Sequence, residues 1–364
     1  MNLGLYVDSS LSIAPAAVAA ERAGFSHLWL YDSPLVFGDT SMAALVAVQA
    51  TSRIGIGPGV ANPLQRPAEY TAQMLATLEV AAPGRVFLGL GVGNSARHSL
   101  KLPPARLADV EAHTRVVRAM LDGGGARQVE GDQERIVRFI HPDGPWVDPQ
   151  PVPLWVSAFG PVGQDMAGRV ADGVLVRWQG RDAVQDIVAR LETATRDPGL
   201  VGRRVQVGVV YAMHPIDHPD ELERPEVRAA LGPLVVSRLR YLTANAQSAD
   251  EVPVAFRDGF EAYRAYRETL DPASRHLDNY RGYLVFTPRD LERFVTPESM
   301  SAVALVGSPA RIAAELSEMA AAGVDHCSLQ MAGDHESWCA RMSEQVFPLL
   351  TKDFDGSTEM EVAA

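Results

Sequence analysis

Short apolar runs alternate with longer, Ala-rich segments along most of the chain. Where the runs are clearest, as in Val86–Leu90 and Gly173–Val176, they are apolar on both faces. Such runs are typical of parallel strands that are covered by helices. The pattern predicts strands at Leu3–Val7, His27–Tyr31, Ile54–Gly57, Val86–Leu90, Leu154–Ser157, Gly173–Val176, Val205–Tyr211 and His326–Gln330.

Helices are predicted between most of these strands, because the intervening segments are rich in Ala and other helix-forming residues. They are Ala14–Gly24, Thr40–Ala50, Arg66–Val80, Pro104–Leu121, Val162–Val170, Asp182–Thr195 and Pro309–Ala322. Eight strand–helix units fill a closed barrel, and no acidic residue is placed to bind the ribose of a dinucleotide. The sequence therefore predicts an α/β fold, a (β/α)8 TIM barrel, in preference to an open doubly wound sheet.

Two segments interrupt this alternation. Gln128–Ile140, with Gly131 and Asp132 between two alternating runs, predicts a β-hairpin before the fifth strand. The larger insertion, residues 213–302, lies between the seventh strand and the last helix and contains an aromatic-rich helical stretch at Phe256–Tyr266. Because long insertions after a barrel strand lie over the C-terminal mouth, we interpret it as a substrate lid. A segment that packs against a second subunit is the alternative.

Length and composition indicate one globular domain. A chain of 364 residues suits a barrel with insertions, so residues 1–364 are predicted to form a single domain. No apolar run reaches the roughly 18 residues that a membrane span needs. The N-terminus resembles a first strand and not an export signal, so a soluble, cytoplasmic protein is expected. The two cysteines, Cys327 and Cys339, are not spaced for a disulfide framework or a metal site.

The charge of the chain argues against two classes of partner. A net charge of −12 does not suit a nucleic-acid binder or a protein that binds acidic membranes, because both need a basic surface. The Arg-rich stretch 224–240 also carries acidic residues, and we interpret it as a solvated helix face.

Glycine-rich motifs end three of the predicted strands. They are GPGVANP at 57–63, GLGVGN at 89–94 and SAFGP at 157–161. A glycine has no Cβ, so backbone N–H groups can come within bonding distance of a ligand. One such motif more often only reverses the chain, but three at neighbouring strand ends predict a concave backbone surface for a flat ring system and a phosphate.

These motifs resemble those of the bacterial luciferase-like superfamily. Within it, the chain is similar to the branch that uses the deazaflavin coenzyme F420, which includes methylenetetrahydromethanopterin reductase. The resembling segments are LWLYDSP at 28–34, GPGVANP at 57–63, TLE at 77–79, PGRVFLGLGVGN at 83–94, PLWVSAFGP at 153–161, AGRVADG at 167–173, VGSP at 306–309 and AGVD at 322–325. The resemblance covers nearly the whole chain except the lid. It implies the same barrel, a small-molecule substrate, and a homodimer packed through helices near the second and third strands.

The resemblance also implies where the cofactor lies. A non-prolyl cis peptide is expected between Gly59 and Val60, with Val60 against the central ring of the cofactor and Asn62 offering an amide to the ring edge. From the residues alone, an ordinary turn or β-bulge is the alternative. The residues expected around the phosphate and ribityl chain are Gly91, Val92, Gly93, Asn94, Ser157, Phe159, Gly160, Pro161, Val162 and Gly163. The helix that follows Gly160 would present its N-terminus to the phosphate.

The candidate catalytic residues depart in part from the family pattern. Asp32 and Ser33 stand where many relatives have Asp-His, and Ser33 cannot serve as an imidazole acid. Asp32 is expected to bond the ring system, with a local turn cap as the alternative. His276, in the lid, matches a histidine that some relatives direct into the pocket. It is the candidate proton donor, with an ordinary surface histidine as the alternative.

Three residues are candidates for substrate binding. Arg177 and Trp178, just past the sixth strand, suit an anionic group and an aromatic face. For Arg177, the cofactor's acidic tail or solvation at the barrel rim are alternatives. Tyr283 is one of several tyrosines in the lid.

The favoured function is that of an F420-dependent oxidoreductase, in which a hydride passes between the deazaflavin and a small organic substrate under the lid. An FMN-dependent luciferase-like monooxygenase is the first alternative, and a non-catalytic flavin-binding protein is the second. Gly-Pro after the fifth strand, in place of a Thr/Ser-rich phosphate loop, favours F420 by analogy within the fold.

Overall fold

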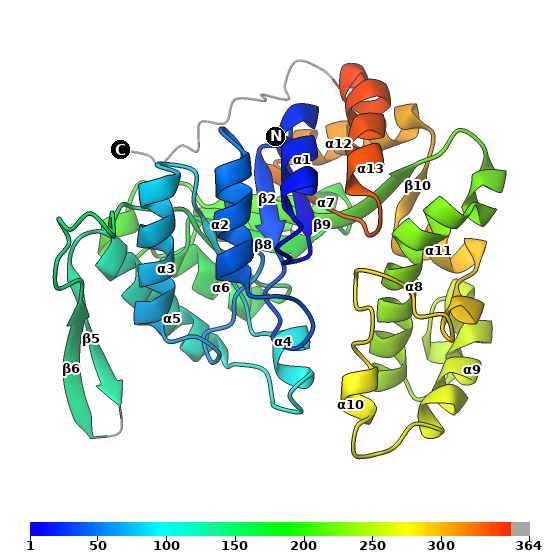
Figure 1. Cartoon of the computed structure of the whole chain (residues 1–364), viewed down its shortest axis with the longest axis horizontal. Coiled ribbons are helices and arrows are strands. Elements are labelled where there is room, and N and C mark those ends of the chain that lie inside the picture. Colours follow the sequence, from blue (N-terminus) through cyan, green and yellow to red (C-terminus); the bar gives the residue numbers. More distant parts are fainter. Residues whose placement is uncertain (131, 351–364) are drawn as a thin grey trace.

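Parallel strands form a nearly closed barrel at the centre of the molecule (Figure 1). The computed structural model describes residues 1–130 and 132–350. In this part of the chain the barrel strands are β1 (Asn2–Val7), β2 (His27–Leu30), β3 (Gly55–Pro58), β4 (Leu88–Leu90), β7 (Leu154–Ser157), β8 (Gly173–Arg177), β9 (Gln206–Pro215) and β11 (His326–Gln330). They pair in the order β3-β2-β1-β11-β9-β8-β7-β4. Single bridges, Ile56 to Val86 and Ala61 to Leu90, join β3 to β4, so the predicted (β/α)8 barrel is confirmed.

Helices cover the outside of the barrel, as predicted. They are α1 (Ala14–Ala23), α2 (Thr40–Ala50), α3 (Ala68–Ala81), α5 (Leu107–Leu121), α6 (Pro161–Val170), α7 (Arg181–Glu192) and α12 (Pro309–Ala321). Gly24 ends α1 with a φ of 95°, a left-handed conformation that favours glycine. The predicted start of α5 at Pro104 is wrong by three residues, because the backbone N–H of Arg106 is capped by the carboxylate of Asp109.

Outside the larger insertion, two short α-helices of the described residues were not predicted. Helix α4 (Asn94–His98) follows the glycine motif after β4, where the sequence suggests only a loop. Helix α13 (His335–Arg341) follows β11 and packs on α1. The ring of Trp338 stacks against that of Phe25 with centroids 5.9 Å apart, so a tertiary contact accompanies this short helix.

Aromatic residues fill the inside of the barrel. The inner cluster consists of Tyr6, Trp29, Tyr31, Phe87, Trp155 and Leu175. The ring centroids of Trp29 and Phe87 are 4.4 Å apart, and those of Tyr6 and Trp29 are 5.8 Å apart. Since side chains alternate along a strand, Leu5 and Leu28 point outward to the aliphatic layer beneath the helices.

The smaller insertion is a β-hairpin, as predicted. Strands β5 (Gly125–Glu130) and β6 (Gln133–Arg138) pair antiparallel and project away from the barrel (Figure 1). The hairpin begins three residues before the predicted Gln128 and its second strand ends before Ile140. The predicted turn residue Gly131 lies outside the described residues.

The larger insertion forms a helical lobe beside the barrel (Figure 1). Its helices are α8 (Pro225–Asn245), α9 (Arg257–Glu268), α10 (Arg275–Asp278) and α11 (Pro297–Val303), and β10 (Leu305–Gly307) then pairs with β9. The predicted helix over Phe256–Tyr266 is confirmed as α9. The insertion begins later than residue 213, because β9 continues to Pro215. No described helix is long and apolar enough to cross a membrane.

The predicted solvated face at 224–240 is wrong beyond the first turn of α8. Leu231 and Val235 are fully buried, and Arg240 is only 7% exposed. The Nη2 atom of Arg240 donates a hydrogen bond to the backbone oxygen of Arg281 at 2.8 Å. The interpretation failed because α8 is covered by α9 and α11, so its arginines are not all free to meet solvent.

Candidate functional site

The C-terminal ends of the barrel strands bring the predicted cofactor residues to one mouth. Because β2, β3, β4 and β7 are parallel, the segments that follow them lie at the same end of the barrel. These segments carry Asp32, Gly59, Val60, Asn62, Gly91, Val92, Gly93, Asn94, Ser157, Phe159, Gly160, Pro161, Val162 and Gly163. Contact between these residues and a cofactor remains a prediction.

The segment after β3 has the predicted backbone geometry. The peptide bond between Gly59 and Val60 is cis. Val60 is half-buried and packs on the inner aromatic cluster. A Cβ at Gly91 would lie 2.7 Å from Cγ2 of Val60, so the valine leaves no room for a side chain there.

Asn62 joins the ends of two strands. Its Nδ2 atom donates to the backbone oxygen of Gly91 at 3.3 Å, and its Oδ1 atom accepts from the backbone N–H of Leu64 at 2.9 Å. The side chain is buried. These bonds leave one amide hydrogen on Nδ2, so Asn62 holds the mouth together and still has a donor for a ligand.

The N-terminus of α6 is open. Pro161 supplies no N–H group, and the backbone N–H groups of Phe159, Gly160, Val162 and Gly163 have no partner in the described part of the chain. A Cβ built on Gly160 meets no atom within 4 Å. A helix start with unpaired donors is suited to an anion such as a phosphate.

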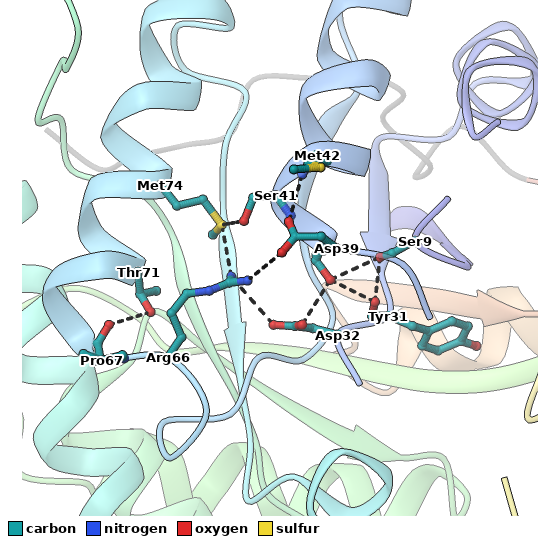
Figure 2. A network of polar contacts seen from close by, with 11 residues as sticks. Ser9, Tyr31, Asp32, Asp39, Ser41, Met42, Arg66, Pro67, Thr71 and Met74 are labelled. Carbon is teal, nitrogen blue, oxygen red and sulfur yellow. Dashed lines mark hydrogen bonds and ion pairs between the residues drawn. The ribbon is translucent and has the colours of Figure 1, made fainter. Parts of the chain in front are cut away.

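Asp32 belongs to a polar network between β2 and α2 (Figure 2). Its Oδ1 atom accepts from the hydroxyl of Thr40 at 3.1 Å, and its Oδ2 atom lies 3.9 Å from Nη1 of Arg66. The Nη2 atom of Arg66 lies 3.7 Å from Oδ2 of Asp39, so the guanidinium stands between two carboxylates. It is Asp39 that caps α2; among the described hydrogen bonds, Asp32 accepts from no backbone N–H and so does not cap a turn.

Burial raises the pKa of Asp32 above its ordinary value. The positive charge of Arg66 and the hydrogen bond from Thr40 act in the opposite direction, and Asp39 adds to the increase. The pKa of Asp32 therefore depends on opposing effects, and a change of charge at Arg66 or Asp39 would shift it.

Ser33 is tied to the next loop of the mouth. Its hydroxyl lies 2.7 Å from that of Ser95, which is in α4, and Ser33 is buried. Sequence reasoning missed Ser95, because it predicted no helix at 94–98 and had no signal that would bring the two loops together.

The helical lobe, predicted to be a lid, reaches the mouth through Tyr283 and Leu284. The ring of Tyr283 is 6.5 Å from that of Phe37, which in turn stacks on Tyr31 at 5.1 Å. Leu284 packs against the inner aromatic cluster. The guanidinium carbon of Arg240 lies 5.9 Å from the ring centroid of Tyr283. Tyr283, predicted to bind substrate, is thus at the mouth.

His276 lies on α10 of the lid and is half-buried. Its Nδ1 atom is buried and has no hydrogen-bond partner. Within the described residues, no hydrogen bond or ion pair connects His276 to Asp32 or Ser33, so its role as proton donor remains a prediction.

Arg177 and Trp178 face different surroundings. The guanidinium carbon of Arg177 lies 4.6 Å from the ring centroid of Phe159, at the rim near α6. The indole N–H of Trp178 donates to Oε1 of Glu315, on α12, at 2.6 Å. Arg177 is exposed and free to meet a ligand, whereas the only donor of Trp178 is already used.

The sequence matches one family over most of its length. The model of the family described as luciferase-like monooxygenase matches residues 12–326. The chain is 27% identical over 230 residues to the 5,10-methylenetetrahydromethanopterin reductase of Methanopyrus kandleri. This match covers 59% of this chain and 65% of that protein. It is also 27% identical over 313 residues to the F420-dependent glucose-6-phosphate dehydrogenase of Amycolatopsis mediterranei. This second match covers 77% of this chain and 90% of that protein.

Solved structures have the same fold. The coenzyme F420 dependent tetrahydromethanopterin reductase from Methanopyrus kandleri superposes with a TM-score of 0.66 at 18% identity, over 96% of this chain and 99% of that chain. The oxygenating constituent of 3,6-diketocamphane monooxygenase from Pseudomonas putida, in complex with FMN, superposes with a TM-score of 0.63 at 15% identity and the same coverage. At these identities the similarity establishes the barrel alone.

Proposed function

The chain belongs to the luciferase-like monooxygenase family, and we propose that it is an oxidoreductase that uses coenzyme F420 to exchange a hydride with a small organic substrate. The observation that carries the proposal is the backbone surface at the barrel mouth. There, Val60 packs on the inner aromatic cluster at the same end of the barrel as the open N-terminus of α6. A flat ring with a phosphate-bearing chain suits such a surface.

The residues present fit this cofactor. The N–H groups of Gly160, Val162 and Gly163 would bind its phosphate, since they have no partner within the described chain and Gly160 leaves the approach clear. Val60 would lie against the ring system, and the remaining amide hydrogen of Asn62 would reach the ring edge. When bound, coenzyme F420 supplies the hydride chemistry, and the protein supplies position and electrostatics.

The lid and the loop after β2 complete the proposed site. Tyr283 and Leu284 would exclude water from the mouth beside Phe37, which stacks on Tyr31. Asp32 would bond the ring system, and burial raises the pKa of its carboxyl group above the ordinary value. The buried and unpaired Nδ1 atom of His276 supports this residue as the proton donor to the substrate. Ser33, bonded to Ser95, would fix the loop that carries Asp32.

The names of the sequence relatives favour F420 over FMN. One relative described as F420-dependent is matched over 90% of its own length. The alternative, an FMN-dependent monooxygenase, is favoured by the family's description and by a structural neighbour that holds FMN. A non-catalytic flavin-binding protein is the remaining alternative, and the lid over the mouth argues against it.

Cofactor titration tests the proposal. The purified full chain is titrated separately with F420 and with FMN, and binding is followed by fluorescence. We expect F420 to bind with a dissociation constant of about 1 μM or lower, equal to about −8 kcal/mol, and FMN to bind at least about 100-fold more weakly. Tight FMN binding with oxygen consumption would move the assignment to the monooxygenase, and cofactor binding with no turnover of any substrate would favour the non-catalytic alternative.

We also propose that the protein is a homodimer packed through α2 and α3, the helices that follow β2 and β3. Four large apolar side chains of these helices are exposed: Met42 (62%), Leu45 (42%), Tyr70 (62%) and Val80 (46%). Such a cluster is typical of a surface that another protein covers.

A further inference from the structure

Two arginines from different parts of the chain share one aromatic ring at the edge of the lid. Arg177 ends β8, and Arg238 lies on α8 of the lid. Their guanidinium carbons lie 5.9 and 5.3 Å from the ring centroid of Tyr241. Arg177 is also 4.6 Å from the ring of Phe159, which precedes α6. The lid and the barrel rim therefore meet at a small surface of two cations and two aromatic rings.

Neither arginine is paired with an acid. In the described part of the chain, no carboxylate lies within ion-pair distance of Arg177 or Arg238, although the protein has 45 acidic and 33 basic residues. Other arginines of the fold, such as Arg118 with Asp172 at 2.8 Å, do have such partners. The rim and the lobe therefore bring together two positive charges that no acidic side chain of the described residues compensates.

The two charges repel each other. Burial lowers the pKa of Arg238, and the positive charge of Arg177 lowers it further. Guanidinium groups nevertheless stay protonated, so both charges persist at neutral pH. An anion between them would form charge-assisted hydrogen bonds with both and would remove the repulsion.

The surroundings are accessible and partly apolar. Phe159 is 55% exposed and Tyr241 is 43% exposed, so a ligand can reach both rings. The surface suits a molecule that has an anionic group attached to an apolar or ring-shaped body.

We propose that Arg177 and Arg238 bind an anionic group of the substrate, a carboxylate or a phosphate, with Tyr241 and Phe159 against the body of the molecule. The inference rests on the proposed function in taking the barrel mouth as the place where substrate binds. It identifies the substrate class as organic anions and adds Arg238 and Tyr241 to the residues that determine specificity.

Inorganic phosphate is the probe for this site. The full chain without cofactor is titrated with phosphate by calorimetry, at an ionic strength held constant with chloride. Because phosphate can also bind at the open N-terminus of α6, the titration is made in the Gly160→Leu background, in which a side chain occupies that space. We then expect saturable binding at one site, and a loss of affinity of about tenfold in each of Arg177→Gln and Arg238→Gln, as for removal of a charge-assisted hydrogen bond. Unchanged phosphate affinity in the double variant would overturn the proposal.

Arg293 provides a matched control. It also lies over aromatic rings, at 5.6 Å from the centroid of Tyr266 and 4.8 Å from that of Phe294, and it too has no carboxylate within ion-pair distance among the described residues. No second arginine of the described residues lies over the face of either ring, and Arg281 contacts Tyr266 through its hydroxyl group. We expect Arg293→Gln to keep the phosphate affinity of the wild type within about twofold. An equal loss in Arg293→Gln would mean that the effect is one of overall charge, and would overturn the site.

Cofactor affinity distinguishes the source of the anionic group. If the group belongs to the substrate, Arg177→Gln and Arg238→Gln should bind F420 as the wild type does. A loss of F420 affinity equal to the loss of phosphate affinity would assign the pair to the cofactor and overturn the substrate assignment. If the wild type binds neither F420 nor FMN, the proposed function fails, whereas the phosphate titration still decides whether this anion site exists.

Discussion

The Nη1 atom of Arg66 lies 3.9 Å from the Oδ2 atom of Asp32, at the edge of the barrel mouth (Figure 2). The pair joins the loop after β2 to the start of α3. Because the carboxylate is mostly buried, its protonation depends on this single cation and on the neighbouring charge of Asp39.

Arg66→Met should raise the pKa of Asp32 further, because the charge that stabilises the carboxylate is lost while its burial remains. Any step that needs ionised Asp32 should then require a higher pH, which the pH dependence of cofactor binding and turnover measures. Asp39→Asn is the matched control, because it should shift the pKa of Asp32 in the opposite direction. It removes a charge that raises the pKa of Asp32, and Asn still caps α2. Identical pH profiles in both variants would mean that Asp32 does not titrate in the reaction.

Gly160→Leu should abolish cofactor binding in a folded protein. A side chain at this position meets no protein atom, so it would project into the space in front of the open helix N-terminus. We expect affinity to fall by about 100-fold or more, equal to about 3 kcal/mol, measured by the same fluorescence titration. Gly199→Leu is the control, since a Cβ at Gly199 also meets no atom within 4 Å. A folded Gly160→Leu protein with wild-type affinity would place the phosphate elsewhere.

The sequence was sufficient for the barrel and for the backbone of the mouth. Runs that are apolar on both faces, such as Gly173–Val176, identify buried parallel strands without any knowledge of their partners. The glycine motifs locate the strand ends, and the resemblance to a family supplied the cis bond after Gly59.

The side-chain networks of the mouth could not be predicted in this way. Arg66 forms an ion pair with Asp32, and the hydroxyl of Ser95 is hydrogen-bonded to that of Ser33. Arg238 lies over the ring of Tyr241, beside Arg177. Except for Arg238 and Tyr241, these partners come from separate loops, and neither periodicity nor composition encodes which loops touch. The burial of Arg240 was missed for the same reason, because it depends on the helices that cover α8.

The buried histidines should make the protein less stable in acid. The rings of His27 and His326 are 4.1 Å apart at the base of the barrel. Burial lowers the pKa of His27 to about 3 and that of His326 well below its ordinary value. In the unfolded chain a histidine has a pKa of about 6.5, so the unfolded state binds more protons below that pH. The stabilising contribution of neutral His27 is therefore present above pH 6.5 and is lost as the pH falls toward 3.

Urea unfolding at several pH values tests this expectation. The free energy of unfolding should fall by about 1.4 kcal/mol per pH unit for each such histidine between pH 6.5 and 4. His27→Gln should show a smaller slope than the wild type, whereas His141→Gln, at an exposed position, should not differ. Equal slopes in the wild type and His27→Gln would contradict the assignment.

The proposed dimer interface can be tested by charge insertion. Met42→Glu and Tyr70→Glu, on neighbouring helices, would place a carboxylate in an apolar interface, at a cost of several kcal/mol per subunit pair. We expect the protein to change from dimer to monomer in light scattering after size exclusion. Val201→Glu, at a site that is 71% exposed outside these helices, should stay dimeric. A wild type that is monomeric at micromolar concentration would exclude this arrangement.

Proton delivery is the step for which this chain departs most from the Asp-His pattern that it resembles. Ser33 cannot serve as an acid, and its hydroxyl is bonded to that of Ser95. If the reaction protonates its substrate, a titratable group of the lid is needed, and the unpaired imidazole of His276 is the candidate.

His276→Ala should lower turnover by about 100-fold, the lower range of general acid–base catalysis, and should leave cofactor affinity unchanged. His98→Ala, at an exposed position of α4, serves as the control and should keep the wild-type turnover. Full turnover in His276→Ala would mean that solvent or a lid tyrosine such as Tyr283 supplies the proton, and Tyr283→Phe would then separate these two sources.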